Sequence, residues 1–589
     1  MRIKNARNCK DVNREPSPMK WHIKNTNKDQ TLLEKLLANR GLRDHRSINS
    51  FLNPSHKNLY NPLLLGDMAR AIERIRKAIE KEERIIVYGD YDVDGITATA
   101  IVFRALKKVN ANVSYRLPHR IEDGYGLNEK FIREFAKLNV KVVITVDCGI
   151  SCAREISLAR ELGIDVIVTD HHAIPTKEPS DAYAILHPRY KNSLYPFKDL
   201  TGAGVALKLA YALLGDSAHE FTDLAAIGTI ADIAPLLDEN RFIVKQGLEM
   251  LQNPKWHGLK QLKYYAGIQD GDKINTHLIE YRIAPRINAA GRISHPYYAL
   301  QLLLQDDGGK KVDDLAKSLD QFNSRRQSIT ERAFAEAEEM FARSELATLA
   351  RQKIIIAHNP KWHSGIIGLI AGKLADKYKL PTIITNETNG YVVGSARSPE
   401  YFNIIEAITS ASKYLEHFGG HAAAAGFTLK KENLDKFTDA LKSYAKKITP
   451  PDSEALIEID AEVLPHDITF ETIELIQQFE PFGTGNPEPV FLLRNALPKN
   501  IKTVGKNKDH IKFEIEPSIQ IANKKHMSEI ARHSVNPSAM PIEAIGFHLG
   551  EYAQKIEKAN SADIVFNLQK NIFNGKTALQ MNIIDLKIN

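Results

Sequence analysis

The stretch "RIIVYGDYDVDG", residues 84–95, joins a short apolar run to three acidic residues. Its β-branched start predicts a buried strand, and the residues that follow it, 96–109, carry apolar side chains at helical spacing. Asp90, Asp92 and Asp94 lie between them on alternate positions, where an extended backbone would point the side chains of Asp92 and Asp94 the same way. Because like charges repel, the stretch predicts either a polar turn that caps a helix or a site that binds cations.

Two further predicted strands also end in aspartate. "VKVVITVD" ends at Asp147 and "IDVIVTD" ends at Asp170, with the helical stretch "SCAREISLAREL" between them. Strands that alternate with helices of this length predict an α/β domain with a doubly wound, mostly parallel sheet. Ligands of such sheets bind beyond the carboxyl ends of the strands. We therefore expect Asp92, Asp147 and Asp170 to converge on one edge of the sheet.

The rest of the chain predicts three more parts. A charged stretch with few helix breakers, from Asp314 to Arg343, predicts a long helix between two domains. "KIIIAH", "GIIGLIAGKLADKY" and "PTIIT" then predict a second α/β region, and short alternating segments near the C-terminus predict a small β-barrel. The expected division is a polar N-terminal leader of unassigned role (1–40), a catalytic α/β domain (41–305), a connector helix (306–348), the second α/β domain (349–450) and the barrel (455–589).

The composition is that of a globular chain. Its 589 residues are 43% hydrophobic and 26% charged, and no run approaches the roughly 18 apolar residues of a membrane span. Residues 1–27 lack the apolar stretch of a signal peptide, and Cys9, Cys148 and Cys152 cannot form a disulfide framework. These features predict a cytoplasmic protein. The net charge of +7 permits a polyanionic partner without requiring one.

The residue types at the expected sheet edge indicate a metal site. Clustered carboxylates suit hard divalent cations, and Mn²⁺ also accepts imidazole, which His171 would supply directly after Asp170. With three cysteines the chain lacks the two cysteine pairs of a Cys₄ zinc site, and it contains neither HExxH nor a GxxxxGK[ST] loop. Structural zinc, zincin and P-loop chemistries therefore have no motif support.

Four motifs, "DYDVDG", "VDCG", "TDHH" and "GTIADIAPL", resemble those of the DHH phosphoesterase superfamily. Further stretches narrow the resemblance to its RecJ family, from about residue 40 to the end of the chain. The resemblance implies a DHH domain, a DHHA1 domain and a C-terminal OB-fold domain. The stretches concerned are "RIEDGYGL", "APRINAAGRI", "GSARS", "FGGHAAAAGF" and "FEPFGTGNPEPVF".

The resemblance implies two bound cations, Mn²⁺ or Mg²⁺. Asp92 and Asp94 would bind separate cations, and Asp147 would bridge them. His171 and Asp232 would complete one coordination shell. Relatives that are pyrophosphatases carry a histidine ligand where this chain has Tyr88, so one cation is expected to have fewer protein ligands.

Three other residues would support this site. His172 would face the scissile phosphate, and Asp170 would orient the neighbouring imidazole. Asp90 would lie beside the ligands without binding a cation itself.

The resemblance also implies a pocket for a terminal 5′-phosphate, formed by Arg120, Ser395 and Arg397. Arginine forks bind phosphate oxygens in pairs, and a hydroxyl adds a donor. A surface ion pair of Arg120 with Glu122 or Asp123 is the alternative. The remaining expected substrate contacts are His421 from the second domain and Arg286, Asn288 and Arg292 along the path of the strand.

OB-fold grooves usually bind single strands through basic residues and aromatic stacking. The chain offers basic and aromatic residues for this role, although a solvated charged strand face would have the same composition. The residues are Lys506, Lys508, His510, Lys512 and Phe513.

The function that the resemblance implies is hydrolysis of single-stranded DNA from its 5′ end, releasing 5′-mononucleotides, in recombination and repair. Two cations would activate water and offset charge on the leaving oxygen. The protein would act as a monomer, with a single-strand DNA-binding protein and a helicase as partners. The alternatives are a DHH phosphodiesterase acting on short RNA or cyclic dinucleotides, and a non-catalytic single-strand-binding relative.

Overall fold

The computed structural model describes residues 19–343, 353–450, 456–515, 541–559, 561–573 and 576–589. The chain forms two compact units: residues 54–450 with the short segment 483–485, and the N-terminal residues together with the C-terminal part of the chain. Among the described helices, none combines the length and the apolar character needed to cross a membrane.

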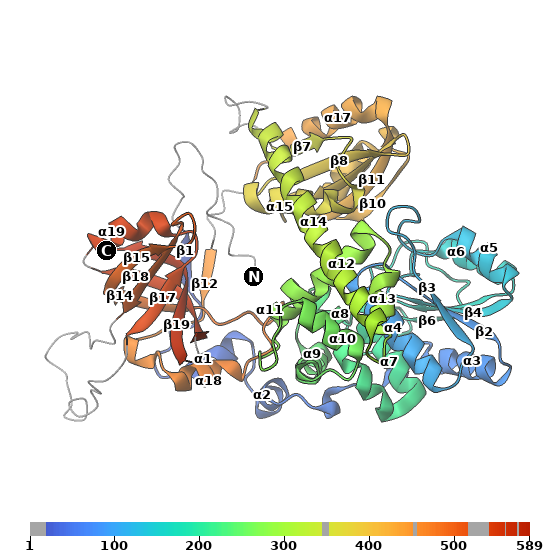
Figure 1. Cartoon of the computed structure of the whole chain (residues 1–589), viewed down its shortest axis with the longest axis horizontal. Coiled ribbons are helices and arrows are strands. Elements are labelled where there is room, and N and C mark those ends of the chain that lie inside the picture. Colours follow the sequence, from blue (N-terminus) through green and yellow to red (C-terminus); the bar gives the residue numbers. More distant parts are fainter. Residues whose placement is uncertain (1–18, 344–352, 451–455, 516–540, 560, 574–575) are drawn as a thin grey trace. The chain divides into compact units, whose positions relative to one another are not determined.

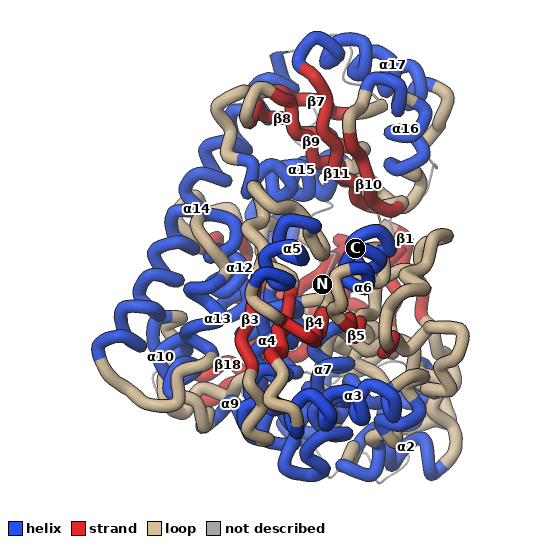
Figure 2. Tube along the Cα trace, turned by 90° about the vertical axis from the view of Figure 1, so that its right-hand side faces the viewer, coloured by secondary structure: helices blue, strands red, loops and turns tan. Residues whose placement is uncertain are grey.

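The larger unit begins with a five-stranded, fully parallel sheet in the order β3-β2-β4-β5-β6 (Figures 1 and 2). This sheet confirms the predicted α/β class. Its strands are β2 (Arg84–Gly89), β3 (Val113–Arg116), β4 (Val140–Val146), β5 (Asp165–Thr169) and β6 (Ala184–Leu186).

Helices cover both faces of this sheet, because alternate side chains of each strand point to opposite faces. In β2, Ile85 and Val87 join the hydrophobic core on one face, whereas Ile86 and Tyr88 join the core on the other. Both faces are therefore buried, as a doubly wound sheet requires. The first face packs on α3 (Met68–Glu80), α4 (Val93–Lys108) and α7 (Gly202–Leu214), and the second on α5 (Glu129–Lys137) and α6 (Ala153–Glu161).

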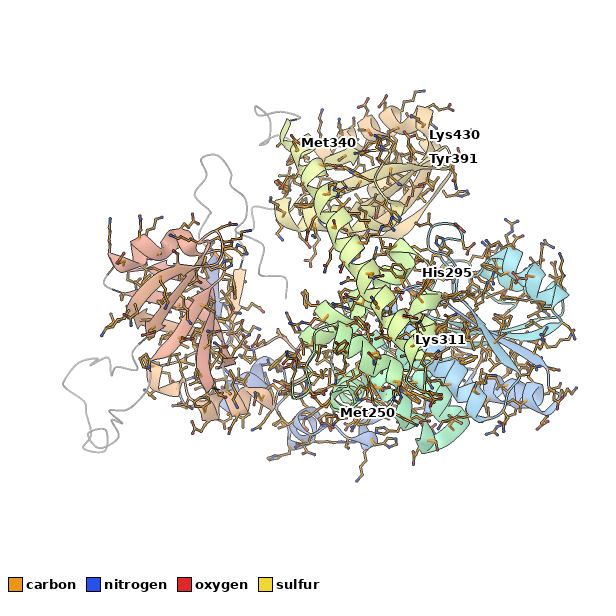
Figure 3. The ribbon with its side chains drawn as sticks, viewed as in Figure 1. Met250, His295, Lys311, Met340, Tyr391 and Lys430 are labelled. Atoms are coloured by element: carbon orange, nitrogen blue, oxygen red, sulfur yellow. The ribbon has the colours of Figure 1, made fainter. Side chains whose placement is uncertain are left out.

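A helical layer extends the first core and leads into the predicted long helix. Helix α14 (Lys310–Arg343) buries Leu319 in the core of the first sheet and Ala337 in the core of the second α/β region. Figure 3 labels Lys311 and Met340 near the two ends of α14. The other helices of this layer are α8 (Thr222–Ala231), α9 (Asp238–Gln252), α10 (His257–Tyr265), α11 (Thr276–Leu278), the π-helical turn Ile279–Ile283, α12 (Ala284–Ile293) and α13 (Tyr297–Leu303).

The second α/β region contains a mixed sheet in the order β10-β11-β9-β8-β7, in which only β7 and β8 pair in parallel. Helix α15 packs its apolar face against this sheet through Ile366 and Ile370. The elements are β7 (Ile355–His358), α15 (Ser364–Tyr378), β8 (Thr382–Thr388), β9 (Tyr391–Arg397), α16 (Ile404–Ser410), β10 (His417–His421), β11 (Ala424–Lys430) and α17 (Leu434–Lys446).

The smaller unit contains a seven-stranded sheet in the order β13-β14-β18-β19-β17-β16-β15, in the part of the chain where a β-barrel is predicted. The predicted strand "HIKFEI" is β16. The elements are β12 (Leu456–Ile459), β13 (Ala461–Glu462), α18 (Phe470–Gln477), β14 (Phe491–Ala496), β15 (Pro498–Val504), β16 (His510–Ile515), β17 (Ile542–Gly546), α19 (Ala553–Glu557), β18 (Ala562–Phe573) and β19 (Lys576–Ile588).

The N-terminal residues differ from the expectation of a leader without a role. Strand β1 (Lys20–Ile23) pairs in parallel with β12, and helices α1 (Leu32–Asn39) and α2 (His45–Leu52) pack into the C-terminal core. The described residues 19–53 therefore belong to the smaller unit, so the expected start of the catalytic domain at residue 41 differs from the structure. Pairing between the two ends of a chain leaves no periodic signal in either segment.

Candidate metal centre and phosphate pocket

The acidic stretch after β2 divides its three carboxylates between a turn and a helix. Asp92 is the N-cap of α4, and its side chain accepts a hydrogen bond of 3.1 Å from the N–H of Gly95. Asp94 already belongs to the first helical turn. The expectation of an extended segment that points Asp92 and Asp94 the same way is therefore wrong, because the helix begins at Val93.

Helix α7 approaches Asp94 end-on. The Asp94 carboxylate accepts hydrogen bonds from the N–H groups of Gly202 at 2.6 Å and Ala203 at 2.9 Å, at the positive end of the helix dipole. A Cβ at Gly202 would lie 2.5 Å from the Cβ of Asp147, and one at Gly228 would lie 2.7 Å from Oδ1 of Asp94. Glycine at these two positions lets the helices hold the carboxylates close together.

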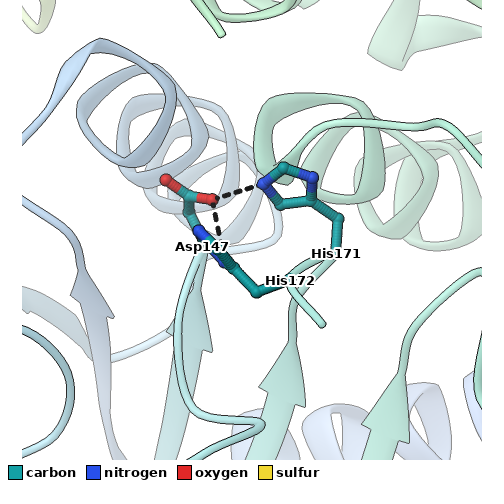
Figure 4. Close-up of side chains that lie close together, drawn as sticks. All are labelled: Asp147, His171 and His172. Carbon is teal, nitrogen blue, oxygen red and sulfur yellow. Dashed lines mark ion pairs between the residues drawn. The ribbon is translucent and has the colours of Figure 1, made fainter. Parts of the chain in front are cut away.

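Asp147 follows β4 with a left-handed backbone, φ +60°. Its N–H donates to the carbonyl of Thr169 at 3.0 Å, which links the ends of β4 and β5. Its Oδ1 lies 3.1 Å from Nε2 of His171 and 3.9 Å from Nδ1 of His172 (Figure 4). The expected convergence of residues that follow separate strands is thus present at this edge of the sheet.

The converging groups form two sets around Asp147, which we call the metal cluster. One set joins Asp94, His171 and Asp232, with Nε2 of His171 lying 3.6 Å from Asp94 and 3.9 Å from Asp232. The other set joins Asp90, Asp92 and Asp147, each of which offers an oxygen within 4.8 Å of the others. Asp90, expected only beside the ligands, therefore lies within reach of a cation.

Asp170 organises the two histidines that follow it. Its Oδ1 accepts from the N–H of His171 and lies 2.8 Å from Nδ1 of His172, while its Oδ2 accepts from the N–H of Ile150. Burial opposes ionisation of Asp170, but these hydrogen bonds lower its pKa to about 2. The hydroxyl of Tyr125 lies 3.2 Å from the same Nδ1 of His172. Tyr125 is a neighbour of the site that the sequence analysis did not single out.

The metal cluster is electrostatically unfavourable without cations. Burial and neighbouring carboxylates raise the pKa of Asp90 to about 8 and that of Asp232 to about 8, and they raise that of Asp147 well above its usual range. Within the described chain, Oδ1 of Asp90, Oδ1 of Asp147 and Nε2 of His171 are buried without a hydrogen-bond partner. Oxygen donors with one imidazole fit Mn²⁺ or Mg²⁺, and such cations would satisfy all three atoms.

A second group of like charges lies where the two α/β regions meet. Arg120 lies 4.2 Å above the ring of Tyr91, Arg292 donates to the carbonyl of Gly365 at 3.0 Å, and Arg397 donates to Ser395 at 3.3 Å. Burial, followed by the charges of neighbouring arginines, lowers the pKa of Arg292 and that of Arg397. We call these residues, with Arg326, the arginine pocket: Arg120, Arg292, Arg326, Ser395 and Arg397.

Arg326 joins the pocket from the connector helix α14, a position that the sequence analysis did not predict. Its charge acts on Arg292, and burial lowers its own pKa. Its Nε, like that of Arg120, is buried without a hydrogen-bond partner among the described residues. Helical spacing alone could not have identified Arg326, because the same stretch carries other arginines on its exposed faces.

The three remaining expected substrate contacts lie on α12 and β10. Arg286 binds Asp320 of α14 with two nitrogens, at 3.0 and 2.8 Å, so the structure gives it a carboxylate partner rather than an open fork. Asn288 is half-buried on α12, and His421 is exposed at the end of β10. Their roles toward DNA stay predictions.

In the smaller unit, two of the expected DNA contacts are engaged elsewhere. Phe513 is only 1% exposed in the core, and Lys512 pairs with Glu543 at 2.8 Å. The alternation along β16 turns Phe513 inward, so its expected stacking on DNA is contradicted. Lys506 and Lys508 are exposed on the hairpin before β16, next to His510.

Three family descriptions match successive parts of the chain. The DHH family, N-terminal domain, matches residues 84–229, and the DHHA1 domain matches residues 351–447. The RecJ OB domain matches residues 459–523 and 517–585. Together they cover the second α/β region, most of the C-terminal sheet and every residue of the metal cluster except Asp232.

Curated relatives and solved structures carry the same family name. The single-stranded-DNA-specific exonuclease RecJ of Bacillus subtilis (strain 168) is 36% identical, over 97% of this chain and 71% of that protein. The enzyme of that name from Haemophilus influenzae is 30% identical, over 95% and 96%. The crystal structure of Thermus thermophilus RecJ in complex with Mn²⁺ matches with a TM-score of 0.78 and 28% identity, over 96% of this chain and 79% of that chain. The structure of the same protein with Mg²⁺ matches with a TM-score of 0.72 and 27% identity, over 96% of this chain and 78% of that chain. With the metal cluster, the two α/β regions and the C-terminal sheet in the family's order, this chain belongs to the RecJ family.

Proposed function

We propose that this protein hydrolyses phosphodiester bonds of single-stranded DNA from the 5′ end and releases 5′-mononucleotides. The observation that carries the proposal is that the metal cluster adjoins the arginine pocket within one unit. Arg120 acts electrostatically on Asp90, and Asp92 acts on Arg292. A site for cations beside a site for a phosphate dianion suits cleavage near a phosphorylated chain end.

The metal cluster would hold Mn²⁺ or Mg²⁺ through its oxygen and imidazole donors. Asp94, His171 and Asp232 would bind one cation, Asp92 the other, and Asp147 both, with Asp90 as a further oxygen donor. When bound, two cations supply an activated water and offset charge on the leaving oxygen. All the expected donors are present in the chain, which argues against a non-catalytic relative.

His172 would steady the scissile phosphate. Burial lowers the pKa of the His172 imidazole, but the hydrogen bond with Asp170 and the negative charge of Asp170 outweigh this effect and raise the pKa to about 9. With Nδ1 engaged by Asp170, its Nε2–H remains to donate a hydrogen bond to a phosphate oxygen.

The arginine pocket would give the direction of cleavage. Arg120, Arg292, Arg326 and Arg397 present guanidinium groups that a terminal 5′-phosphate can neutralise through paired hydrogen bonds. A strand held by this phosphate would place the next phosphodiester at the metal cluster, so one nucleotide would leave in each turn of the reaction.

Release of nucleotides from end-labelled strands tests the proposal. With Mn²⁺ present, a 5′-phosphorylated single strand labelled at its 5′ end should release labelled mononucleotide at once, while a 3′-labelled strand should release its label only after complete digestion. A duplex and a cyclic dinucleotide should be cleaved far more slowly. Early release from the 3′ label, or preferential cleavage of the cyclic dinucleotide, would contradict the proposal.

Other parts of the proposal come from the family resemblance. The protein would act in the cytoplasm as a monomer during recombination and repair, alongside a single-strand DNA-binding protein and a helicase. The metal-binding and catalytic roles would fall to the DHH domain. The DHHA1 domain would contribute substrate contacts through Ser395, Arg397 and His421, and the OB-fold domain would bind DNA. Light scattering and pull-down from purified components would test the oligomeric state and the two partners.

A further inference from the structure

Ile233, the residue directly after Asp232, has an unusual backbone conformation. It adopts φ +60°, in the left-handed region. Among the described residues, twelve other than glycine have positive φ, and eight of them are Asn, Asp or His, which tolerate this region best. Ile233 alone among them is aliphatic, and its β-branched side chain makes the conformation least favourable.

The end of helix α8 imposes this conformation. The N–H of Ile233 donates to the carbonyl of Ile230 at 3.1 Å, and the N–H of Ala234 donates to that of Thr229 at 3.3 Å. These two bonds form a Schellman motif, in which the left-handed position is usually glycine. The helix end therefore requires a left-handed residue at 233 but gives no reason for isoleucine.

Packing within the protein does not explain the isoleucine either. Ile233 is 59% exposed, so burial within the chain offsets little of the backbone cost. Local strain of this kind gathers at functional sites. The neighbouring Asp232 belongs to the metal cluster, and consecutive Cα atoms are only about 3.8 Å apart.

We propose that Ile233 is a substrate-contact residue whose side chain packs against a nucleoside flanking the scissile phosphate. The metal cluster and the arginine pocket recognise only phosphate oxygens, whereas an exposed branched side chain beside Asp232 offers an apolar surface to the sugar and base. The inference rests on the proposed function. It adds a contact to the nucleoside that neither charged group makes.

Two substitutions test the inference because they should separate stability from activity. Ile233→Gly and Ile233→Asn suit the left-handed backbone, so we expect the melting temperature to rise by about 2–4 °C. On a 5′-phosphorylated single strand, kcat/KM should nevertheless fall about tenfold, since the apolar contact is lost. Lys379→Gly is the matched control: Lys379 also has φ +54° at a helix end, is exposed, and lies at the end of α15 outside the site. It should change the melting temperature similarly and leave kcat/KM unchanged.

A modified strand identifies the group that Ile233 contacts. When propanediol spacers replace both nucleosides that flank the scissile phosphate, wild type and Ile233→Gly should have the same kcat/KM. Three outcomes would each overturn the inference. They are an equal loss of kcat/KM on the normal and the spacer strand, a weaker affinity of the variant for Mn²⁺, and an unchanged kcat/KM on the normal strand. If the wild type released no nucleotide, the proposed function would fail, but the affinities of both proteins for the two strands, measured by fluorescence anisotropy in EDTA, would still decide the role of Ile233.

Discussion

The metal cluster and the arginine pocket are two groups in which charges of one sign gather, but they are assembled differently. The metal cluster is built within the first α/β region, and backbone N–H groups fix its carboxylates, as those of Gly202 and Ala203 do for Asp94. The arginine pocket draws on distant parts of the chain, since Arg120, Arg326 and Arg397 come from the first α/β region, α14 and β9.

This difference in assembly suits two different proposed tasks, binding of cations by the metal cluster and recognition of the strand end by the arginine pocket. Backbone N–H groups hold the carboxylates of Asp92 and Asp94 in place, which suits cations that require fixed coordination distances. The arginine pocket draws residues from both α/β regions and from α14, so its proposed binding of phosphate would depend on how these parts pack together. Variants of the metal cluster should therefore affect the chemical step, and variants of the pocket should affect the choice of strand end.

The largest effect is expected from Asp147→Asn. Asp147 belongs to the set with Asp90 and Asp92, and its Oδ1 lies 3.1 Å from His171 of the other set, so its loss should lower the release of nucleotides by about a thousandfold or more. Removing one of several repelling carboxylates should also raise the metal-free melting temperature by a few degrees. Nucleotide release and calorimetry in EDTA measure the two effects. The exposed Asp307→Asn serves as control, and near-normal turnover of Asp147→Asn would refute the site assignment.

Arg397→Ala should sharpen the comparison by acting on the strand end alone. Hydrogen bonds to charged groups contribute roughly 1.5–3 kcal/mol, so kcat/KM should fall about 10- to 100-fold on a 5′-phosphorylated strand. A 5′-hydroxyl strand should be much less affected. Arg286→Ala is the control, because its partner is Asp320 and its loss should change stability but not the ratio between the strands. An equal loss on both strands for Arg397→Ala would count against the pocket.

A smaller effect is expected from Gly368→Ala, which tests how tightly the pocket is packed. A Cβ at Gly368 would lie 3.0 Å from Oγ of Ser395 and 3.3 Å from a terminal nitrogen of Arg397. The guanidinium would have to shift slightly, so KM for a 5′-phosphorylated strand should rise about threefold to tenfold. Gly372→Ala, on the same helix with nothing within 4 Å of its Cβ, should have no effect on KM. Identical KM values for the two variants would show that Arg397 does not need its present position.

The smallest effect is expected in the C-terminal unit, where exposed and paired lysines can be compared. If Lys506 and Lys508 bind phosphates, replacing both with alanine should reduce the slope of log affinity against log salt by about 1.4 for single strands. Lys512→Ala should leave the slope unchanged, because Lys512 already pairs with Glu543. Titrations at several salt concentrations measure the slopes. A larger decrease in slope for Lys512→Ala than for the double variant would instead indicate that the DNA contact lies on β16.

Much of the site could be predicted because its residues follow local patterns. Parallel strands bring their carboxyl ends to one edge, so Asp92, Asp147 and Asp170 could be expected there together. The mutual direction of Asp92 and Asp94 could not be predicted, since it depends on whether the backbone after Asp92 is extended or helical. The chain starts α4 at Val93, which brings Asp94 to the end of α7.

By itself, the sequence determined the fold class, the donor types of the metal cluster and the resemblance to the RecJ family, because these depend on residue types and short spacings. Only the tertiary structure decided which charged side chains have a partner of opposite charge and which side chains are buried. It paired Arg286 with Asp320, brought Arg326 to the arginine pocket and placed Phe513 in the hydrophobic core of the C-terminal unit. It also joined residues 19–53 to the C-terminal unit. Such outcomes depend on contacts between segments far apart in the chain, and no local pattern records those contacts.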